Sequence, residues 1–143
     1  MSPSTQHGFT LVELMIAMAI IGILAASAVV SYQIYSTRAQ VSEGFAAAVA
    51  IKAGVAEYHA GFAELPSDIA SLGYSPELAL AGRSYRAIDV GSNGVITVTY
   101  RRIGDRVADG STVVFSPDAT GPVMTWTCNG GSVAPVYRPS ACR

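Results

Sequence analysis

The sequence predicts an α+β fold in which one long N-terminal α-helix packs on a four-stranded antiparallel β-sheet. The first observation is the uncharged run Leu14–Thr37, which is followed by an Ala-rich amphipathic stretch without Pro until Pro66. The second is a group of four short segments with strand-like alternation in residues 85–127. A helix with one apolar stripe needs a partner surface, and the apolar face of the sheet provides it.

The composition indicates one domain of ordinary size, since the chain has 143 residues and half of them are apolar. A net charge of −1 with 13% charged residues excludes a generally basic, nucleic-acid-binding surface. Residues 1–80 hold two basic and six acidic residues, whereas residues 81–143 hold seven basic and four acidic residues. The two halves, or neighbouring copies in a stack, would therefore attract each other. An ordinary solvated mixed surface is the simpler explanation, because exposed ion pairs contribute little.

Residues 1–8 are polar, and residues 9–35 are predicted to be a hydrophobic transmembrane helix. The uncharged part has 24 residues and would span about 36 Å as a helix, enough to cross a bilayer core. A secretory signal peptide fits less well, because the basic n-region is missing and the apolar run is too long. A plain membrane anchor fits the length but leaves the acidic Glu13 unexplained.

The helix is expected to continue from about Phe9 to about Ala60, and residues 36–61 form its amphipathic half. This half is rich in Ala, the strongest helix former. Glu43 and Glu57 are predicted to lie on its solvent side. The apolar stripe has steps of three and four residues and comprises Phe45, Ala48, Ile51, Val55, Tyr58 and Phe62.

Residues 62–84 are predicted to be a surface loop with a helical turn near Ser67–Leu72, because Pro and Gly interrupt them repeatedly. The antiparallel sheet is expected in residues 85–127, with a hairpin connection at Gly91–Gly94. Its four strands are predicted at Tyr85–Val90, Val95–Tyr100, Thr112–Phe115 and Val123–Thr127. Residues 36–143 are thus expected to form a globular domain.

Cys128 and Cys142 lie near the C-terminus and bound a segment rich in Gly, Pro and Ser. They could form a disulfide, half of a metal site or two free thiols. Two thiolates cannot complete a tetrahedral zinc site, and both histidines are distant in sequence. With a membrane-targeted N-terminus, a disulfide is the leading interpretation, and it would stabilise the fold by about 3 kcal/mol. The loop of residues 128–142 is then a displayed surface, a staple for the C-terminus, or both.

Glu13 is the most informative residue, because a carboxylate in a membrane costs about 2.5–3.5 kcal/mol on insertion scales and needs a partner. A cut between Gly8 and Phe9 would create an α-amino group about one helical turn from Glu13. In a stack of helices the same carboxylate could meet the amine of the next subunit, and nonpolar surroundings would strengthen this attraction. An unpaired acid near the membrane interface is the alternative.

The N-terminal segment closely resembles the class III signal of type IV pilins. The resemblance rests on the sequence GFTLVELMIA at Gly8–Ala17 and on AIIGILAA at residues 19–26. It continues through Tyr32, Tyr35 and the RAQVSE of residues 38–43. It implies the type IV pilin fold for the rest of the chain.

The resemblance also implies a processing and assembly route. Prepilin peptidase would remove the leader of residues 1–8 after Gly8 and N-methylate Phe9. Glu13 would be needed for assembly, where it neutralises the N-terminal amine of a neighbour. The subunit would wait in the inner membrane until the inner-membrane assembly machinery moves it into a helical filament, a fimbrium on the cell surface.

The sequence therefore predicts a structural subunit of a type IV pilus that serves adhesion, twitching motility or DNA uptake. A minor pilin or a type II secretion pseudopilin is the alternative, and the pair Cys128 and Cys142 favours a pilin. A membrane-anchored periplasmic binding domain is the rival from another class, and Glu13 argues against it. No enzyme activity, catalytic set, metal site or cofactor is predicted. Weak DNA binding is the role suggested for Arg101, Arg102, Arg106 and Arg138.

Overall fold

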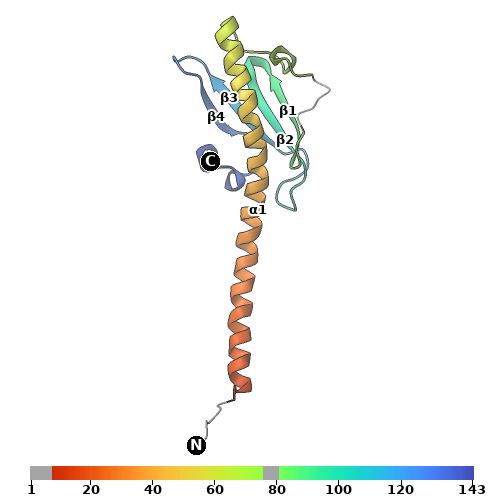
Figure 1. Ribbon diagram of the computed structural model, residues 1–143, viewed down its shortest axis with the longest axis vertical. Helices are drawn as coiled ribbons and strands as arrows, with labels where there is room; N and C mark the ends of the chain where they lie inside the picture. Colours follow the sequence, from red (N-terminus) through yellow and green to blue (C-terminus); the bar gives the residue numbers. More distant parts are fainter. Residues whose placement is uncertain (1–7, 76–80) are drawn as a thin grey trace, which may run out of the picture. The chain divides into compact units, whose positions relative to one another are not determined.

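The computed structural model describes residues 8–75 and 81–143, and it confirms the predicted fold of a long helix on an antiparallel sheet. The chain divides into two compact units, Met1–Tyr35 and Ser36–Arg143. Figure 1 labels the helix α1 and the strands β1 to β4. The elements are α1 (Leu11–Phe62), η1 (Ala70–Leu72), β1 (Tyr85–Gly91), η2 (Ser92–Gly94), β2 (Val95–Tyr100), β3 (Thr112–Asp118), β4 (Thr125–Gly130), η3 (Pro135–Tyr137) and η4 (Ser140–Cys142).

In the first unit, α1 exposes apolar side chains on all its sides. The side chains of residues 11–33 are exposed throughout, and Phe9 just before the helix is 81% exposed. α1 is long and apolar enough to cross a membrane. Helical structure continues without a break through Gly22 and Val30. An apolar surface of this extent needs lipid or other helices around it.

In the second unit, one side of α1 covers one face of the sheet (Figure 1). Its buried residues recur every three or four positions and are Thr37, Val41, Gly44, Ala48, Ile51 and Val55. The predicted stripe is right for Ala48, Ile51 and Val55, but it is wrong at its end, where Phe62 is 67% exposed. α1 ends at Phe62, and Ala63 follows in the left-handed region with φ of 57°.

The sheet has the order β1-β2-β3-β4, and all neighbouring strands are antiparallel. Its fourth strand lies later than predicted, because β4 begins at Thr125 opposite Asp118 and continues to Gly130. Val123, the predicted start of this strand, is exposed. Between β1 and β2, the turn at η2 has positive φ at Asn93 and at Gly94, which suits a tight hairpin.

Helix and sheet approach each other closely at Gly44. Tyr100, at the end of β2, is fully buried, and its hydroxyl donates a hydrogen bond of 2.7 Å to the carbonyl oxygen of Val41. A Cβ atom at Gly44 would lie 2.4 Å from this hydroxyl and 2.9 Å from a methyl group of Val98. Gly44 therefore makes room for the ring of Tyr100 against the helix.

Glu43 does not lie on a free solvent face as predicted. It faces the loop before β1 and holds it on α1. The Oε1 atom accepts a hydrogen bond of 2.9 Å from the backbone N–H of Arg83, and Oε2 accepts one of 2.6 Å from the Ser84 hydroxyl. The bond from Ser84 lowers the pKa of Glu43 below its ordinary value of 4.5, against the opposing effect of burial.

We expect the variant Glu43→Gln to lower the free energy of unfolding by about 1 kcal/mol at pH 7, since an ionised acceptor is replaced by a neutral one. Because the folded-state pKa is depressed, the stabilisation is present above pH 4.5 and is lost as the pH falls through the lowered value. Thermal unfolding of the full chain in detergent at pH 7 and pH 3 measures this. A gap between wild type and variant that stays the same at both pH values would contradict it.

Candidate assembly site

The first turn of α1 is closed by a reciprocal contact between Thr10 and Glu13. The backbone N–H and the hydroxyl of Thr10 donate hydrogen bonds of 2.9 and 2.7 Å to Oε2 of Glu13. In return, the backbone N–H of Glu13 donates one of 3.3 Å to the hydroxyl oxygen of Thr10. This arrangement is a capping box, and it satisfies backbone donors that a helix start leaves without partners.

The capping box explains why α1 begins at Leu11 rather than at the predicted Phe9. It was not predicted above, although the Thr-x-x-Glu spacing is the usual sequence signature of such a cap. It also places the acid of Glu13 beside the start of the chain that a cut after Gly8 would create. Both bonds from Thr10 end on Oε2, so Oε1 has no hydrogen-bond donor among the described residues.

The junction between Gly8 and Phe9 lies outside the helix. Both residues are exposed and have no regular secondary structure, and beyond its two chain neighbours no residue lies within 4 Å of the position of a Cβ at Gly8. The backbone at this junction is therefore accessible without unwinding of α1. Gly8, Phe9 and Glu13 thus lie together at one end of the first unit.

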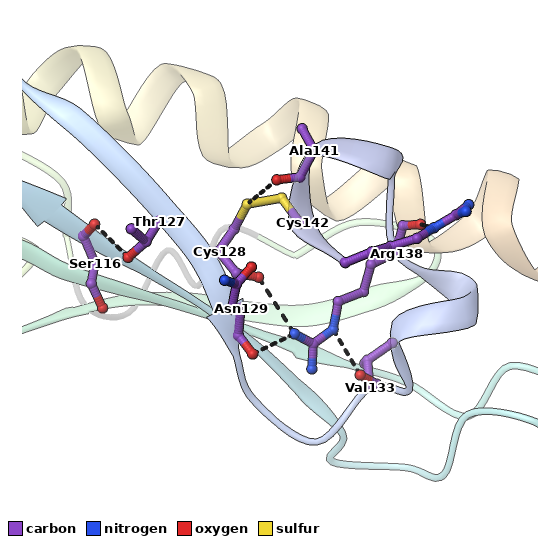
Figure 2. Close-up of a disulfide and its surroundings, with 9 residues drawn as sticks. Ser116, Thr127, Cys128, Asn129, Val133, Arg138, Ala141 and Cys142 are labelled. Carbon is purple, nitrogen blue, oxygen red and sulfur yellow. Dashed lines mark hydrogen bonds between the residues drawn. A yellow bond between two sulfur atoms is a disulfide. The ribbon is translucent and has the colours of Figure 1, made fainter.

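The second candidate region is the C-terminal loop, which a disulfide closes. Cys128 on β4 is joined to Cys142 on η4, with 5.0 Å between their Cα atoms, and both residues are buried (Figure 2). The Sγ atom of Cys128 lies 3.8 Å from the carbonyl oxygen of Ala141. The disulfide restricts the conformations of the unfolded chain, and this lower entropy of the unfolded state stabilises the folded domain.

Arg138 lies inside this loop, and Figure 2 shows its guanidinium directed at the backbone around Cys128 and Val133. Nε donates a hydrogen bond of 2.8 Å to the carbonyl oxygen of Val133. Nη1 donates a hydrogen bond of 2.6 Å to the carbonyl oxygen of Asn129 and a longer one to that of Cys128. Nη2 donates one of 3.0 Å to the carbonyl oxygen of Gly131. The side chain therefore fixes the loop from within.

This position corrects the suggestion that Arg138 belongs to a DNA-binding surface, because the residue is only 4% exposed. Arg101, Arg102 and Arg106 are exposed and lie between β2 and β3. Acidic residues are interspersed with them, and Asp109 forms an ion pair with Arg86. Within residues 8–75 and 81–143, no group of three or more metal-binding side chains comes together.

Comparison with known proteins places these features in one family. The sequence profile of the pilin family, described as pilin of a bacterial filament, matches residues 37–143. The chain belongs to the pilin family. A profile described as the prokaryotic N-terminal methylation motif matches residues 3–29 of this pilin, which include Gly8, Phe9 and Glu13.

Relatives of this pilin include fimbrial proteins and major pilins. It is 39% identical over 147 residues to the fimbrial protein EcpC of Eikenella corrodens, an alignment that covers 100% of this chain and 94% of EcpC. It is 45% identical over 94 residues to the type IV major pilin protein PilE of Neisseria gonorrhoeae, covering 66% of this chain and 56% of PilE. A fimbrial protein of Neisseria meningitidis serogroup A is 46% identical over 94 residues, an alignment that covers 66% of this chain and 55% of that protein. These two alignments cover about half the length of each Neisseria protein.

The predicted family and function are confirmed at this level. The pilin is a structural subunit of a type IV pilus, and pilins of this kind assemble into a filament that forms a surface fimbrium. The apolar first unit is consistent with anchoring in a membrane before assembly.

Proposed function

We propose that this pilin is the major subunit of its pilus and is made as a precursor that prepilin peptidase cuts between Gly8 and Phe9. The same enzyme N-methylates Phe9. The exposed, non-helical junction and the match to the N-terminal methylation motif support this proposal. Residues 9–35 then form the transmembrane and polymerisation helix, which the inner-membrane assembly machinery transfers into the filament.

The observation that carries the assembly mechanism is an acid on a helix that is otherwise apolar and exposed. Glu13 is the one ionisable side chain between Phe9 and Tyr32. In the filament, helices of neighbouring copies replace lipid around it, so the carboxylate stays in a medium of low dielectric and still needs a cation. The α-amino group of Phe9 on an adjacent copy supplies this cation. Thr10 occupies Oε2 and leaves Oε1 for that amine.

We expect the variant Glu13→Gln to reduce surface fibres at least tenfold, about 1.4 kcal/mol per subunit contact, while the pilin still accumulates in the membrane. Glutamine keeps an oxygen for the capping box but has no charge to pair with the amine. Sheared fibres are quantified against membrane-bound pilin, and electron microscopy counts them. Thr10→Ser, which retains the capping hydroxyl, is the matched control. Normal fibre yield from Glu13→Gln would refute the amine–carboxylate mechanism.

Two further measurements separate the proposed function from its alternatives. Mass spectrometry of sheared fibres should find a peptide that begins with N-methylated Phe9, and an intact Met1 terminus there would refute the processing step. Deletion of the gene should abolish fibres if the chain is the major subunit. Fibres that persist would instead indicate a minor pilin or a type II secretion pseudopilin. Assays of adhesion, twitching and DNA uptake in the same strain assign the role of the fibre.

A further inference from the structure

The end of the second unit at which α1 stops is acidic. No Lys or Arg occurs in residues 53–82. The chain segments around this end meet at Gly94, where an added Cβ would lie within 3.4 Å of Val55, Leu65 and Pro117. The exposed acids on these segments are Glu57, Glu64, Asp68 and Asp118.

A groove crosses this acidic end between α1 and η1. It has a volume of about 390 Å³ and is lined by Gly54, Glu57, Tyr58, Gly61, Phe62, Ser71 and Leu72. The rings of Tyr58 and Phe62 lie 4.7 Å apart. Glu57 is exposed beside them. A carboxylate next to two aromatic rings is the environment that a guanidinium group prefers, because it offers an ion pair and a ring face together.

Two of the acids at this end, Glu57 and Glu64, have no ion-pair partner in the described part of their own copy. Glu57 lies in the last turns of α1 and Glu64 just beyond its end at Phe62, where the helix dipole is negative and disfavours an acid. A cation from outside the copy could therefore pair with these carboxylates without displacing an ion pair among the described residues.

The opposite end of the same unit carries free arginines. Arg101 and Arg102 follow directly after Tyr100, whose hydroxyl contacts Val41 near the start of this part of α1. Both arginines are exposed, and their guanidinium groups have no hydrogen-bond or ion-pair partner among the described residues. Along the helix, Val41 and Val55 are about 21 Å apart. An arginine at this end therefore cannot reach the groove of its own copy.

We propose that the groove at Glu57, Tyr58 and Phe62 accepts the side chain of Arg101 or Arg102 from a second copy of this chain. The guanidinium group pairs with Glu57 and stacks on the exposed ring of Phe62. The second copy fits because the acidic end and the basic end lie at opposite ends of one unit, so each copy supplies both halves of a head-to-tail contact that repeats along a stack. The proposal rests on the proposed filament function.

Charge reversal tests this contact in cells that make the full pilin. Glu57→Arg alone, and Arg101→Glu with Arg102→Glu, should each reduce fibre yield at least about fivefold, because each places like charges at every contact. All three changes together should return the yield to within about twofold of wild type. Asp89→Arg reverses an exposed acid on β1 that does not line the groove, and it should have no effect. Normal yield from the separate reversals, or no rescue by the combination, would overturn the proposal.

Zero-length carbodiimide cross-linking gives a second measurement that needs no assembly defect. Lys52 is the one lysine in the sequence, so purified fibres of Arg102→Lys carry one new reactive amine. Cross-linked dimers with a bond between positions 102 and 57 support the contact. Their absence in intact fibres of both Arg102→Lys and Arg101→Lys would refute it. Wild-type cells without any fibres of this chain would instead refute the proposed function.

Discussion

The variant Arg138→Gln should lower the free energy of unfolding by about 3–5 kcal/mol, because several carbonyl acceptors lose a charged donor and each unsatisfied group costs about 1–3 kcal/mol. Its guanidinium group donates to carbonyl oxygens of the disulfide-closed loop, three of them within 3.0 Å. The shorter glutamine cannot reach them all, so several buried acceptors lose their donor. For a domain of this size, the change corresponds to a fall in Tm of more than about 10 °C.

Thermal unfolding of the full chain in detergent measures the global effect, and the rate of disulfide reduction by a small thiol measures the local one. Cys128 and Cys142 are buried under the loop that Arg138 holds, so a loosened loop should be reduced faster. Arg102→Gln is the matched control, since the guanidinium group of this exposed arginine has no partner among the residues that the structure describes and its loss should change stability by less than about 0.5 kcal/mol. A Tm for Arg138→Gln equal to that of the control would show that the loop is held without the guanidinium group.

The position of Arg138 could not be predicted from the sequence. Arginine is usually exposed, and an arginine in a polar C-terminal segment indicates a surface residue on ordinary grounds. Its acceptors are backbone carbonyl groups, and these carry no residue-specific signal. By contrast, the contact of Thr10 with Glu13 was predictable, because both members are side chains at a fixed local spacing.

The same distinction applies to the fold. α1 and the strands β1 to β3 were predicted within a few residues, since periodicity along a single segment encodes them. β4 was displaced, because its position depends on pairing with β3 and on a register shift between Val114 and Ser116. Glu43 was placed on the solvent side for a similar reason, as its partners Arg83 and Ser84 lie about 40 residues away in the chain. Long-range pairing is not visible in local patterns.

The second large effect is expected from Gly44→Ala, which should also cost about 3–5 kcal/mol. Its Cβ would lie 2.4 Å from the hydroxyl oxygen of Tyr100 and 2.8 Å from the adjacent ring carbon, both too close for any real contact. Tyr100 is fully buried and cannot swing into solvent without opening the core. The ring must shift away, which strains the core and breaks the hydrogen bond to Val41, leaving the buried hydroxyl of Tyr100 without an acceptor.

Gly54→Ala in the same helix provides the control, because its added Cβ would make only an ordinary contact of 3.7 Å with Leu72. Alanine is the better helix former by about 1 kcal/mol, so this variant should be more stable than wild type. Opposite changes in Tm from two identical substitutions, ten residues apart on α1, would show that the packing of Tyr100 decides the cost at Gly44. A gain in stability at both positions would mean that helix and sheet do not approach each other as closely as Gly44 and Tyr100 indicate.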